Sequence, residues 1–134
     1  MSDISLGYTI FYVHDVGATV AFFETAFGFE RRMLTPENDY GEIETGTTTL
    51  AFVSLELAGA NLDDAGGFVH PDPARPGAAS VTLITTNVEK VVDHAVTAGA
   101  RRYVDPATKP WGQTVGYVLG PSNLLIEVAT PIIP

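Results

Sequence analysis

A single carboxylate within an apolar run is the residue of this sequence best placed to do chemistry. Glu127 lies in NLLIEVATP, residues 123–131, among aliphatic and β-branched residues that favour a strand. A glutamate in such a strand either faces water or contributes to a site. In a site it could bind a cationic group, accept hydrogen bonds or act as a general base. Two other readings stay open: a structural carboxylate satisfied by neighbouring hydroxyls, and the remnant of a metal site.

Aromatic residues are the second chemical signal. Tyr8, Tyr12, Tyr40 and Phe52 fall in strand-like runs, and Trp111 precedes another such run. Flat apolar rings with a few polar tips suit an aromatic or cationic organic ligand. Packing in a core or at a dimer interface accounts for the same residues equally well, because aromatic side chains are enriched in both places.

The three histidines do not form a recognisable site. His14 ends a strand-like run, His94 lies on the outer face of a predicted helix, and His70 lies in the loop FVHPDPARPG. A metal site needs ligands that converge on one point, so we expect no histidine metal centre. His70 alone is placed to reach a cavity, since a loop can fold over one.

The composition excludes several classes of protein. The chain has 134 residues and no cysteine, which fits one compact domain without disulfides, thiolate zinc sites or cysteine nucleophiles. Its formal net charge of −9 disfavours nucleic acid and anionic membranes as partners. No apolar run approaches the roughly 18 residues of a membrane span, and the N-terminus lacks the features of a signal peptide. We therefore expect a cytoplasmic protein.

The elements that must position these residues occur twice. YTIFYVHDV, residues 8–16, aligns without a gap with SVTLITTNV, residues 80–88. Helical spacing and three short strand-like runs follow each copy, so each half is predicted as β-α-β-β-β. The two modules cover about residues 5–57 and 79–131, and a stretch rich in Gly, Pro and Asp, about 58–78, is the predicted linker.

Capping signals bound the two predicted helices. Asp15 is predicted to cap a first helix that stops at Gly28. Either Thr86 or Asn87 is predicted to cap a second helix that stops at Gly99. A helix packed on one face of each sheet leaves the opposite face free.

Alternation along the strands then sorts the side chains between these faces. Tyr8 and Tyr12 share one side of the first strand, and Glu127 is predicted to face away from the helix. The repeat pairs Tyr8 with Ser80 and Phe52 with Glu127, so these four positions are predicted to share the open side. Under the structural reading, the hydroxyl of Tyr8 or Ser80 satisfies Glu127.

The paired modules, with YTIFYVHDVGATVAFFETAFGFE, WGQTVGYVLGPSNLLIEVATP and the GPSN turn, resemble the vicinal oxygen chelate superfamily. That superfamily includes glyoxalase I, extradiol dioxygenases, and fosfomycin and bleomycin resistance proteins. The resemblance covers nearly the whole chain and implies an α+β fold. Residues 1–134 would form one domain of two tandem βαβββ modules, with a concave mixed sheet and helices on its outer face. It also implies a homodimer, which the exposed edges of open sheets favour.

The resemblance further identifies four strand positions at which metal-dependent members carry ligands. These positions fall on Tyr8, Phe52, Ser80 and Glu127, so one carboxylate remains of four expected ligands. A lone carboxylate does not hold a divalent metal, and we expect no cofactor.

We therefore expect a metal-independent protein that binds a small cationic or aromatic organic ligand in a concave cleft. The predicted ligand contacts are Tyr8, Tyr12, Phe52, Ser80, Trp111 and Glu127. The alternative is a glyoxalase-like lyase, isomerase or dioxygenase with a non-standard or metal-free site, in which Glu127 acts as base and Tyr8 as acid. A structural or partner-binding module is the third reading.

Overall fold

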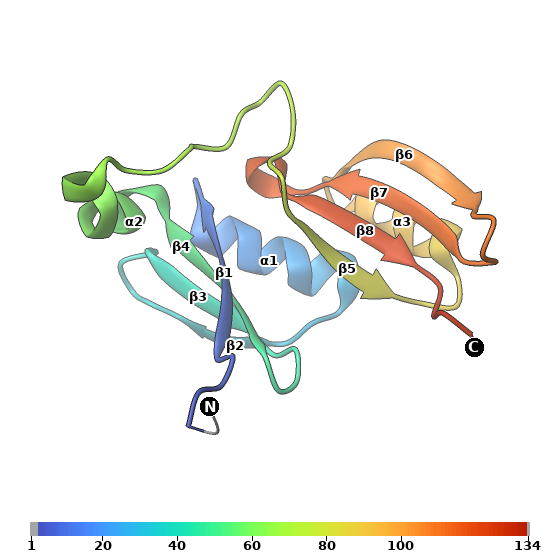
Figure 1. The fold of residues 1–134 in the computed structure, drawn as a ribbon, viewed down its shortest axis with the longest axis horizontal. Coiled ribbons are helices and arrows are strands. Elements are labelled where there is room, and N and C mark those ends of the chain that lie inside the picture. Colours follow the sequence, from blue (N-terminus) through green and yellow to red (C-terminus); the bar gives the residue numbers. More distant parts are fainter. Residues whose placement is uncertain (1–2, 134) are drawn as a thin grey trace. The chain divides into compact units, whose positions relative to one another are not determined.

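The computed structural model describes residues 3–133 and contains two compact units. The first unit runs to His70 and the second begins at Pro71, except that Thr25–Phe27 belongs to the second. Each unit carries one four-stranded mixed sheet, and the order of elements repeats (Figure 1). The predicted α+β fold of two βαβββ modules is confirmed.

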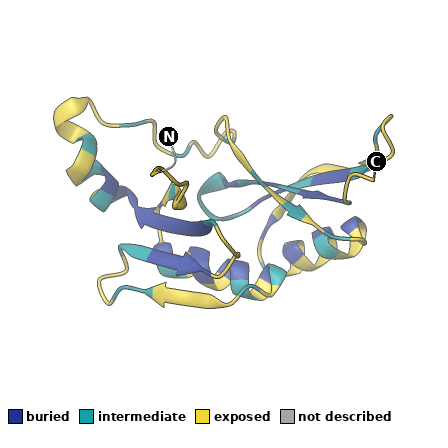
Figure 2. Ribbon diagram, turned by 60° about the horizontal axis from the view of Figure 1, so that its bottom comes forward, coloured by how far each residue is buried: buried dark blue, intermediate teal, exposed yellow. Residues whose placement is uncertain are grey.

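The first module builds a sheet with strand order β1-β4-β3-β2. Its elements are β1 (Tyr8–Val13), α1 (Val16–Phe27), β2 (Arg31–Leu34), β3 (Tyr40–Ile43) and β4 (Thr49–Ser54). Strand β1 runs parallel to β4, and the other pairs are antiparallel. The central strand β4 is buried along its length, whereas the edge strand β2 is mostly exposed (Figure 2).

Helix α1 begins and ends where the capping residues predict. The Asp15 carboxylate accepts a hydrogen bond from the backbone N–H of Ala18 at 3.0 Å, and this bond holds the pKa of Asp15 below its usual value. Gly28 ends the helix in the left-handed conformation, with φ of 75°.

The face of the first sheet that α1 covers is identified by two close contacts. The rings of Phe23 and Phe52 lie 5.2 Å apart between their centroids. A Cβ at Gly41 would meet Val20 Cγ2 at 2.9 Å and Val16 Cγ1 at 3.0 Å, so the helix approaches closely because this strand position lacks a side chain. Phe52 therefore belongs to the core between helix and sheet, and its predicted place on the open face is wrong.

The second module repeats this arrangement with strand order β5-β8-β7-β6. Its elements are β5 (Ser80–Ile84), α3 (Val88–Thr97), β6 (Arg101–Thr108), β7 (Thr114–Leu119) and β8 (Leu125–Ala129). Asn87, one of the two predicted caps, accepts the backbone N–H of Lys90 at 3.2 Å. Helix α3 packs on β6, β7 and β8, with Val92 and Ala95 fully buried.

A short helix, α2 (Leu55–Leu62), occupies the end of the predicted last strand of module one and the start of the predicted linker. Ser54 ends β4 and caps α2, because its hydroxyl accepts the backbone N–H of Leu57 at 3.1 Å. Leu55 and Ala58 are buried, so tertiary packing stabilises a helix where the composition predicts strand and loop. None of the helices in residues 3–133 has the length and apolar character that crossing a membrane requires.

The GPSN turn sets the start of β8. Ser122 and Asn123 both adopt positive φ, 56° and 58°. The Asn123 side chain accepts a hydrogen bond from Arg101 at 2.8 Å and donates one to the carbonyl of Asp72 at 2.7 Å. This turn joins β7 and β8 as a hairpin and thereby determines which residues of the two strands face each other.

Replacing Phe52 by alanine is expected to reduce the free energy of unfolding by about 3–5 kcal/mol, because the change leaves a cavity under α1. Denaturant unfolding monitored by circular dichroism measures this loss. Tyr8→Ala is the matched control, because Tyr8 is 56 % exposed on the opposite face. It should cost about 1 kcal/mol or less. Equal losses for the two variants would contradict the assigned faces.

Candidate functional site

Glu127 occupies the centre of the second sheet, on the face opposite α3. The strand register places it between Thr82 on β5 and Tyr117 on β7. Its neighbours Ile126 and Val128 are fully buried on the other face, against the helix side. The carboxylate thus faces away from the helix, as the alternation along this strand predicts.

Two neutral hydroxyls hold the carboxylate of Glu127. Thr82 Oγ1 donates a hydrogen bond to Oε1 at 2.8 Å, and the Tyr117 hydroxyl donates one to Oε2 at 2.6 Å. Among the ion pairs between residues 3–133, none includes Glu127. The side chain is therefore oriented by hydrogen bonds while its negative charge has no cationic partner there.

The carboxylate alters the acidity of its phenol partner. The pKa of Tyr117 lies above its usual value, chiefly because the phenol donates a hydrogen bond to Glu127 that its ionisation would break. Partial burial, and repulsion between the phenolate and the carboxylate, add to the effect. A phenol with its usual pKa of about 10 is protonated at neutral pH, and the raised pKa of Tyr117 keeps it a hydrogen-bond donor to Glu127 to higher pH.

The hydrogen-bond partners of Glu127 differ from the predicted ones, which are the hydroxyls of Tyr8 or Ser80. Ser80 pairs with Leu125, so it lies two residues before Thr82 along the same face. Tyr117 is not predicted as a site residue, although the signal is present in the sequence. Counting outward from the GPSN turn in a regular hairpin brings Tyr117 opposite Glu127.

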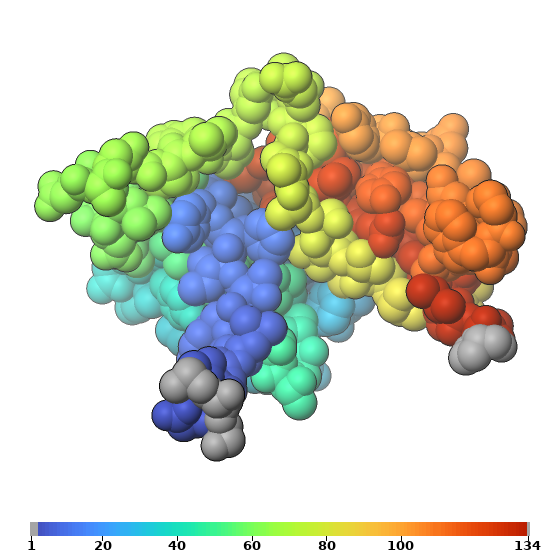
Figure 3. Space-filling view, viewed as in Figure 1, coloured from blue at the N-terminus to red at the C-terminus, as the bar shows by residue number. Residues whose placement is uncertain are grey.

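The strand register of the first sheet explains why the predicted position of Phe52 is wrong. Register pairs Tyr8 with Thr49 and Ser80 with Leu125, so the counterpart of Glu127 on β4 is Ala51. An error of one residue in a strand moves a side chain to the other face. Tyr8 itself lies opposite α1 as predicted, and β1 is visible at the surface in blue in Figure 3.

A second glutamate, which the sequence does not single out, lies on the face of the first sheet opposite α1. Glu42 pairs with Ala51, and its side chain is only 10 % exposed. The Tyr40 hydroxyl donates to Oε2 at 2.5 Å, and Arg32 Nη1 lies 3.5 Å from Oε1. Arg32 also donates to Thr49 Oγ1 at 2.7 Å. Burial, and then this carboxylate, raise the pKa of Tyr40.

Other predicted or suspected residues lie elsewhere. Trp111 occupies the turn between β6 and β7, is 65 % exposed and donates from Nε1 to Gln113 Oε1 at 2.9 Å. In the first unit, Phe68 stands edge-on to Tyr12 with ring centroids 4.9 Å apart, and His70 stacks on Phe68 at 4.8 Å. The loop before residue 71 thus brings His70 to an aromatic group beside Tyr12.

His94 has a structural contact within the second unit. Its Nε2 lies 2.9 Å from the carbonyl oxygen of Thr25, in the last turn of α1. Carbonyls in the last turn of a helix lack partners within the helix, so a side chain that bonds one of them stabilises the helix end. The contact gives His94 a capping role that its predicted position on an outer face does not indicate.

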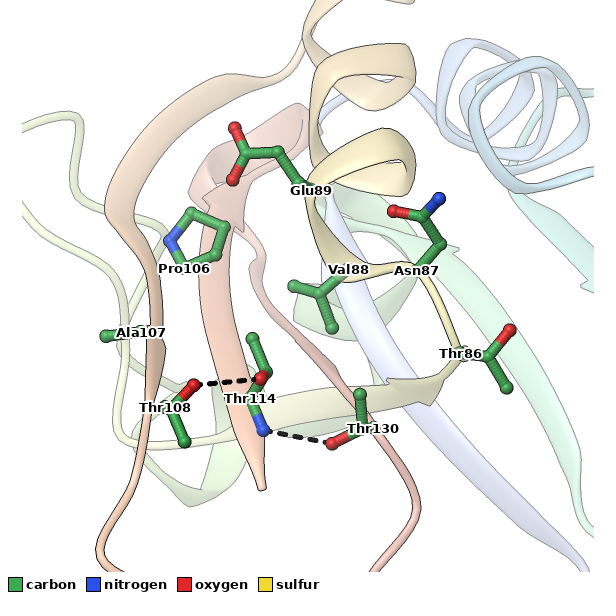
Figure 4. A pocket seen from close by; sticks show the side chains of 9 residues that line it. All are labelled: Thr86, Asn87, Val88, Glu89, Pro106, Ala107, Thr108, Thr114 and Thr130. Atoms are coloured by element: carbon green, nitrogen blue, oxygen red, sulfur yellow. Dashed lines mark hydrogen bonds between the residues drawn. The ribbon is translucent and has the colours of Figure 1, made fainter. Parts of the chain in front are cut away.

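A pocket of about 350 Å³ opens on the other face of the second sheet, between the start of α3 and the β6–β7 hairpin (Figure 4). Its polar groups are largely engaged in structural bonds. Thr114 donates its backbone N–H to Thr130 Oγ1 at 2.9 Å, and Glu89 accepts from Arg102 at 2.6 Å. The lining residues are Thr86, Asn87, Val88, Glu89, Pro106, Ala107, Thr108, Thr114 and Thr130. Glu127 is not among them, so cavity and isolated carboxylate are separate features.

The donor set around Glu127 does not fit a divalent metal. Its two contacts are neutral hydroxyls, and its counterpart on the first sheet is Ala51. Across residues 3–133, no three side chains of the metal-binding types are grouped to hold an ion. Hydroxyls of threonine and tyrosine are weak ligands beside the imidazoles and carboxylates that such metals prefer.

Both the sequence and the fold of this chain are similar to those of known proteins. The family model described as Glyoxalase/Bleomycin resistance protein/Dioxygenase superfamily matches residues 5–128. A family enzyme from Burkholderia phytofirmans PsJN superposes with a TM-score of 0.79 at 18 % identity, covering 97 % of this chain and 100 % of that one. No curated protein sequence matches.

Two further solved structures show the same fold. A glyoxalase-related enzyme from Fulvimarina pelagi has a TM-score of 0.77 at 19 % identity, over 95 % of this chain and 88 % of that one. Lactoylglutathione lyase from Agrobacterium tumefaciens has a TM-score of 0.65 at 15 % identity, over 94 % and 92 % of the two chains. At these identities the likeness concerns the fold and not the reaction.

Replacing Glu127 by glutamine is expected to lower the pKa of Tyr117 toward its usual value, because the hydrogen bond from the phenol to a carboxylate is lost and the phenolate no longer forms beside a negative charge. The tyrosine Cζ signals followed by NMR across alkaline pH measure the shift. Tyr40, which is hydrogen-bonded to Glu42, is the internal control and should titrate as before. An unchanged Tyr117 titration would show that the carboxylate does not govern this phenol.

Proposed function

Because the chain belongs to the Glyoxalase/Bleomycin resistance protein/Dioxygenase superfamily, we propose that it binds a small organic ligand at Glu127 without a metal. The observation that carries the proposal is a half-buried carboxylate that two neutral hydroxyls orient and that forms no ion pair with a residue of 3–133. Such a group binds most strongly to a ligand that supplies the missing positive charge. The net charge of −9 also favours the approach of a cation over an anion.

Apolar side chains beside Glu127 suit the organic part of such a ligand. Leu125 lies two residues earlier on β8, and Ile84 lies two residues beyond Thr82 on β5, so both share the face of the carboxylate. Ile84 is 58 % exposed and Leu125 is half-buried. A ligand placed here would cover apolar surface while its charged group reaches Glu127.

The aromatic contacts of the proposal are revised residue by residue. Tyr117 joins the site because it bonds Glu127 directly. Tyr8 and Tyr12 stay predictions from the sequence, and their side chains lie on the face of the first sheet opposite α1. Phe52 leaves the set because it is buried under that helix.

The metal-free enzyme remains the second candidate, because the same geometry suits a general base. An oriented carboxylate without a cation can accept a proton from a carbon next to a carbonyl. Tyr8 is the predicted acid, and Tyr117 is the phenol that contacts Glu127. Exchange of such a proton for deuterium, present in the native protein and lost in Glu127→Gln, would favour this candidate over binding alone.

A homodimer is also proposed, since each four-stranded sheet ends in two edge strands and open edges favour pairing. Sedimentation velocity is expected to give a mass of about twice 14.2 kDa. A single species at the monomer mass over the working concentration range would contradict this proposal.

Isothermal titration with a panel of cationic aromatic compounds is expected to identify ligands that Glu127→Gln binds at least about tenfold more weakly, because a hydrogen bond to a charged group is lost. Glu37→Gln, at an exposed position of the first unit, removes the same charge and is the matched control. Binding should persist in the presence of EDTA. Absence of heat across the panel, or loss of binding with EDTA, would overturn the proposed function.

A further inference from the structure

The hydrogen bonds that Glu127 already accepts restrict which chemical groups a ligand can present to it. We infer that the group bound at Glu127 is a cation with at least two N–H donors, a guanidinium, amidinium or protonated amine, and not a quaternary ammonium. This inference rests on the proposed function and names the ligand class of that same site. It is carried by Thr82, Tyr117 and Glu127, which we call the acceptor cluster.

All the protons of the acceptor cluster are already used inside it. A threonine or tyrosine hydroxyl has one proton to donate. Thr82 directs its proton to Oε1 of Glu127, and Tyr117 directs its proton to Oε2. The raised pKa of Tyr117 keeps that proton in place to higher pH. The acceptor cluster therefore presents lone pairs and a negative charge to a ligand, and it has no hydrogen-bond donor to spare.

The lone pairs that remain are enough for a forked donor. Each oxygen of a carboxylate accepts two hydrogen bonds, and each oxygen of Glu127 has accepted one. One acceptor position per oxygen is left, so the carboxylate can accept two further N–H groups. A quaternary ammonium would supply charge but leave these positions unpaired once it displaced water, and an unpaired buried acceptor is costly.

The first sheet contains the same three side-chain types together with a guanidinium. There Tyr40 donates to one oxygen of Glu42, and Arg32 Nη1 lies 3.5 Å from the other oxygen and donates to Thr49. The other two nitrogens of that guanidinium, Nε and Nη2, donate to Glu44 at 2.9 Å each, so Glu42 receives a single N–H of the cation. The strand positions differ, since Tyr40 and Glu42 share β3 whereas Tyr117 and Glu127 lie on neighbouring strands. The shared feature is a glutamate that accepts a hydrogen bond from a tyrosine. In the first sheet a guanidinium contacts this glutamate and a threonine, and in the second sheet the threonine donates to the glutamate directly.

The arginines of β6 do not take this place in the second sheet. Arg101 donates to Asn123 in the GPSN turn at 2.8 Å. Arg102 pairs in register with Val118 on the helix side and is bound by Glu89 and Asp93. Both guanidinium groups therefore bind other side chains and not Glu127. Within the described part of the second unit no cationic side chain pairs with Glu127, so we infer that a ligand supplies the cation.

The test compares four probes that share a benzyl or phenyl scaffold and differ at the polar group. Benzamidinium and benzylammonium carry charge and N–H donors, benzyltrimethylammonium carries charge alone, and benzyl alcohol carries neither charge nor N–H. NMR titration at pH 7, following the signals of Thr82 and Tyr117, measures each affinity. We expect benzamidinium to bind at least about tenfold more tightly than benzyltrimethylammonium. Glu127→Gln should abolish this preference, and Glu37→Gln should keep it.

A second variant imitates the first sheet. Thr82→Arg places a guanidinium beside Glu127, as Arg32 lies beside Glu42. It should fold, as judged by unchanged amide signals away from β5, and lose benzamidinium binding at least about tenfold. A variant that folds and binds as tightly as the native protein overturns the inference. Should Thr82→Arg fail to fold, the probe series with Glu127→Gln decides alone.

The outcomes separate this inference from the function on which it rests. If benzamidinium and benzyltrimethylammonium bind equally and both depend on Glu127, the inference is wrong and the proposed function stands. If the preference for N–H donors persists in Glu127→Gln, the acceptor cluster is not its source and the inference is likewise overturned. If no probe binds and the wider cationic panel also gives no heat, both proposals fail.

Discussion

The packing of one helix on one face of each sheet is the constraint from which the site follows. Phe23 meets Phe52 under α1, and Ile126 and Val128 are fully buried on the α3 side. Because side chains alternate along a strand, burial of these residues forces their neighbours to the opposite face. Glu127 lies between Ile126 and Val128, so the helix-side core presents its carboxylate on the open face.

The two sheets deal with a carboxylate on this face in different ways. Glu42 is nearly fully buried and has Arg32 and Tyr40 as partners, as a buried charge requires to be stable. Glu127 is more exposed, and its hydrogen-bond partners among residues 3–133 are two hydroxyls, which orient it and leave its charge available. Within one superfamily fold, the first arrangement is suited to stability, and the second is the basis of the proposed recognition of a cation.

Local chemistry and alternation made much of the fold predictable. Asp15, Gly28 and Asn87 bound helices where their capping chemistry predicts, and the repeat predicts both modules. The predictions that failed depend on distant contacts. A one-residue error in a gapped alignment placed Phe52, in place of Ala51, at the position equivalent to Glu127. Helix α2 forms because Leu55 and Ala58 are buried, which the composition does not reveal. Glu42 is not predicted as a site residue, because its cationic partner Arg32 comes from a different strand, β2.

The sequence by itself determined that a lone carboxylate would stand on the open face of a βαβββ module, with no histidine or cysteine near it in the chain. Periodicity and capping suffice for this, since both act over a few residues. Only the tertiary structure decided what surrounds that carboxylate. Thr82 and Tyr117 reach Glu127 across strand pairings separated by 45 and 10 residues. Such pairings depend on register, which turn geometry and the packing of the whole module set together.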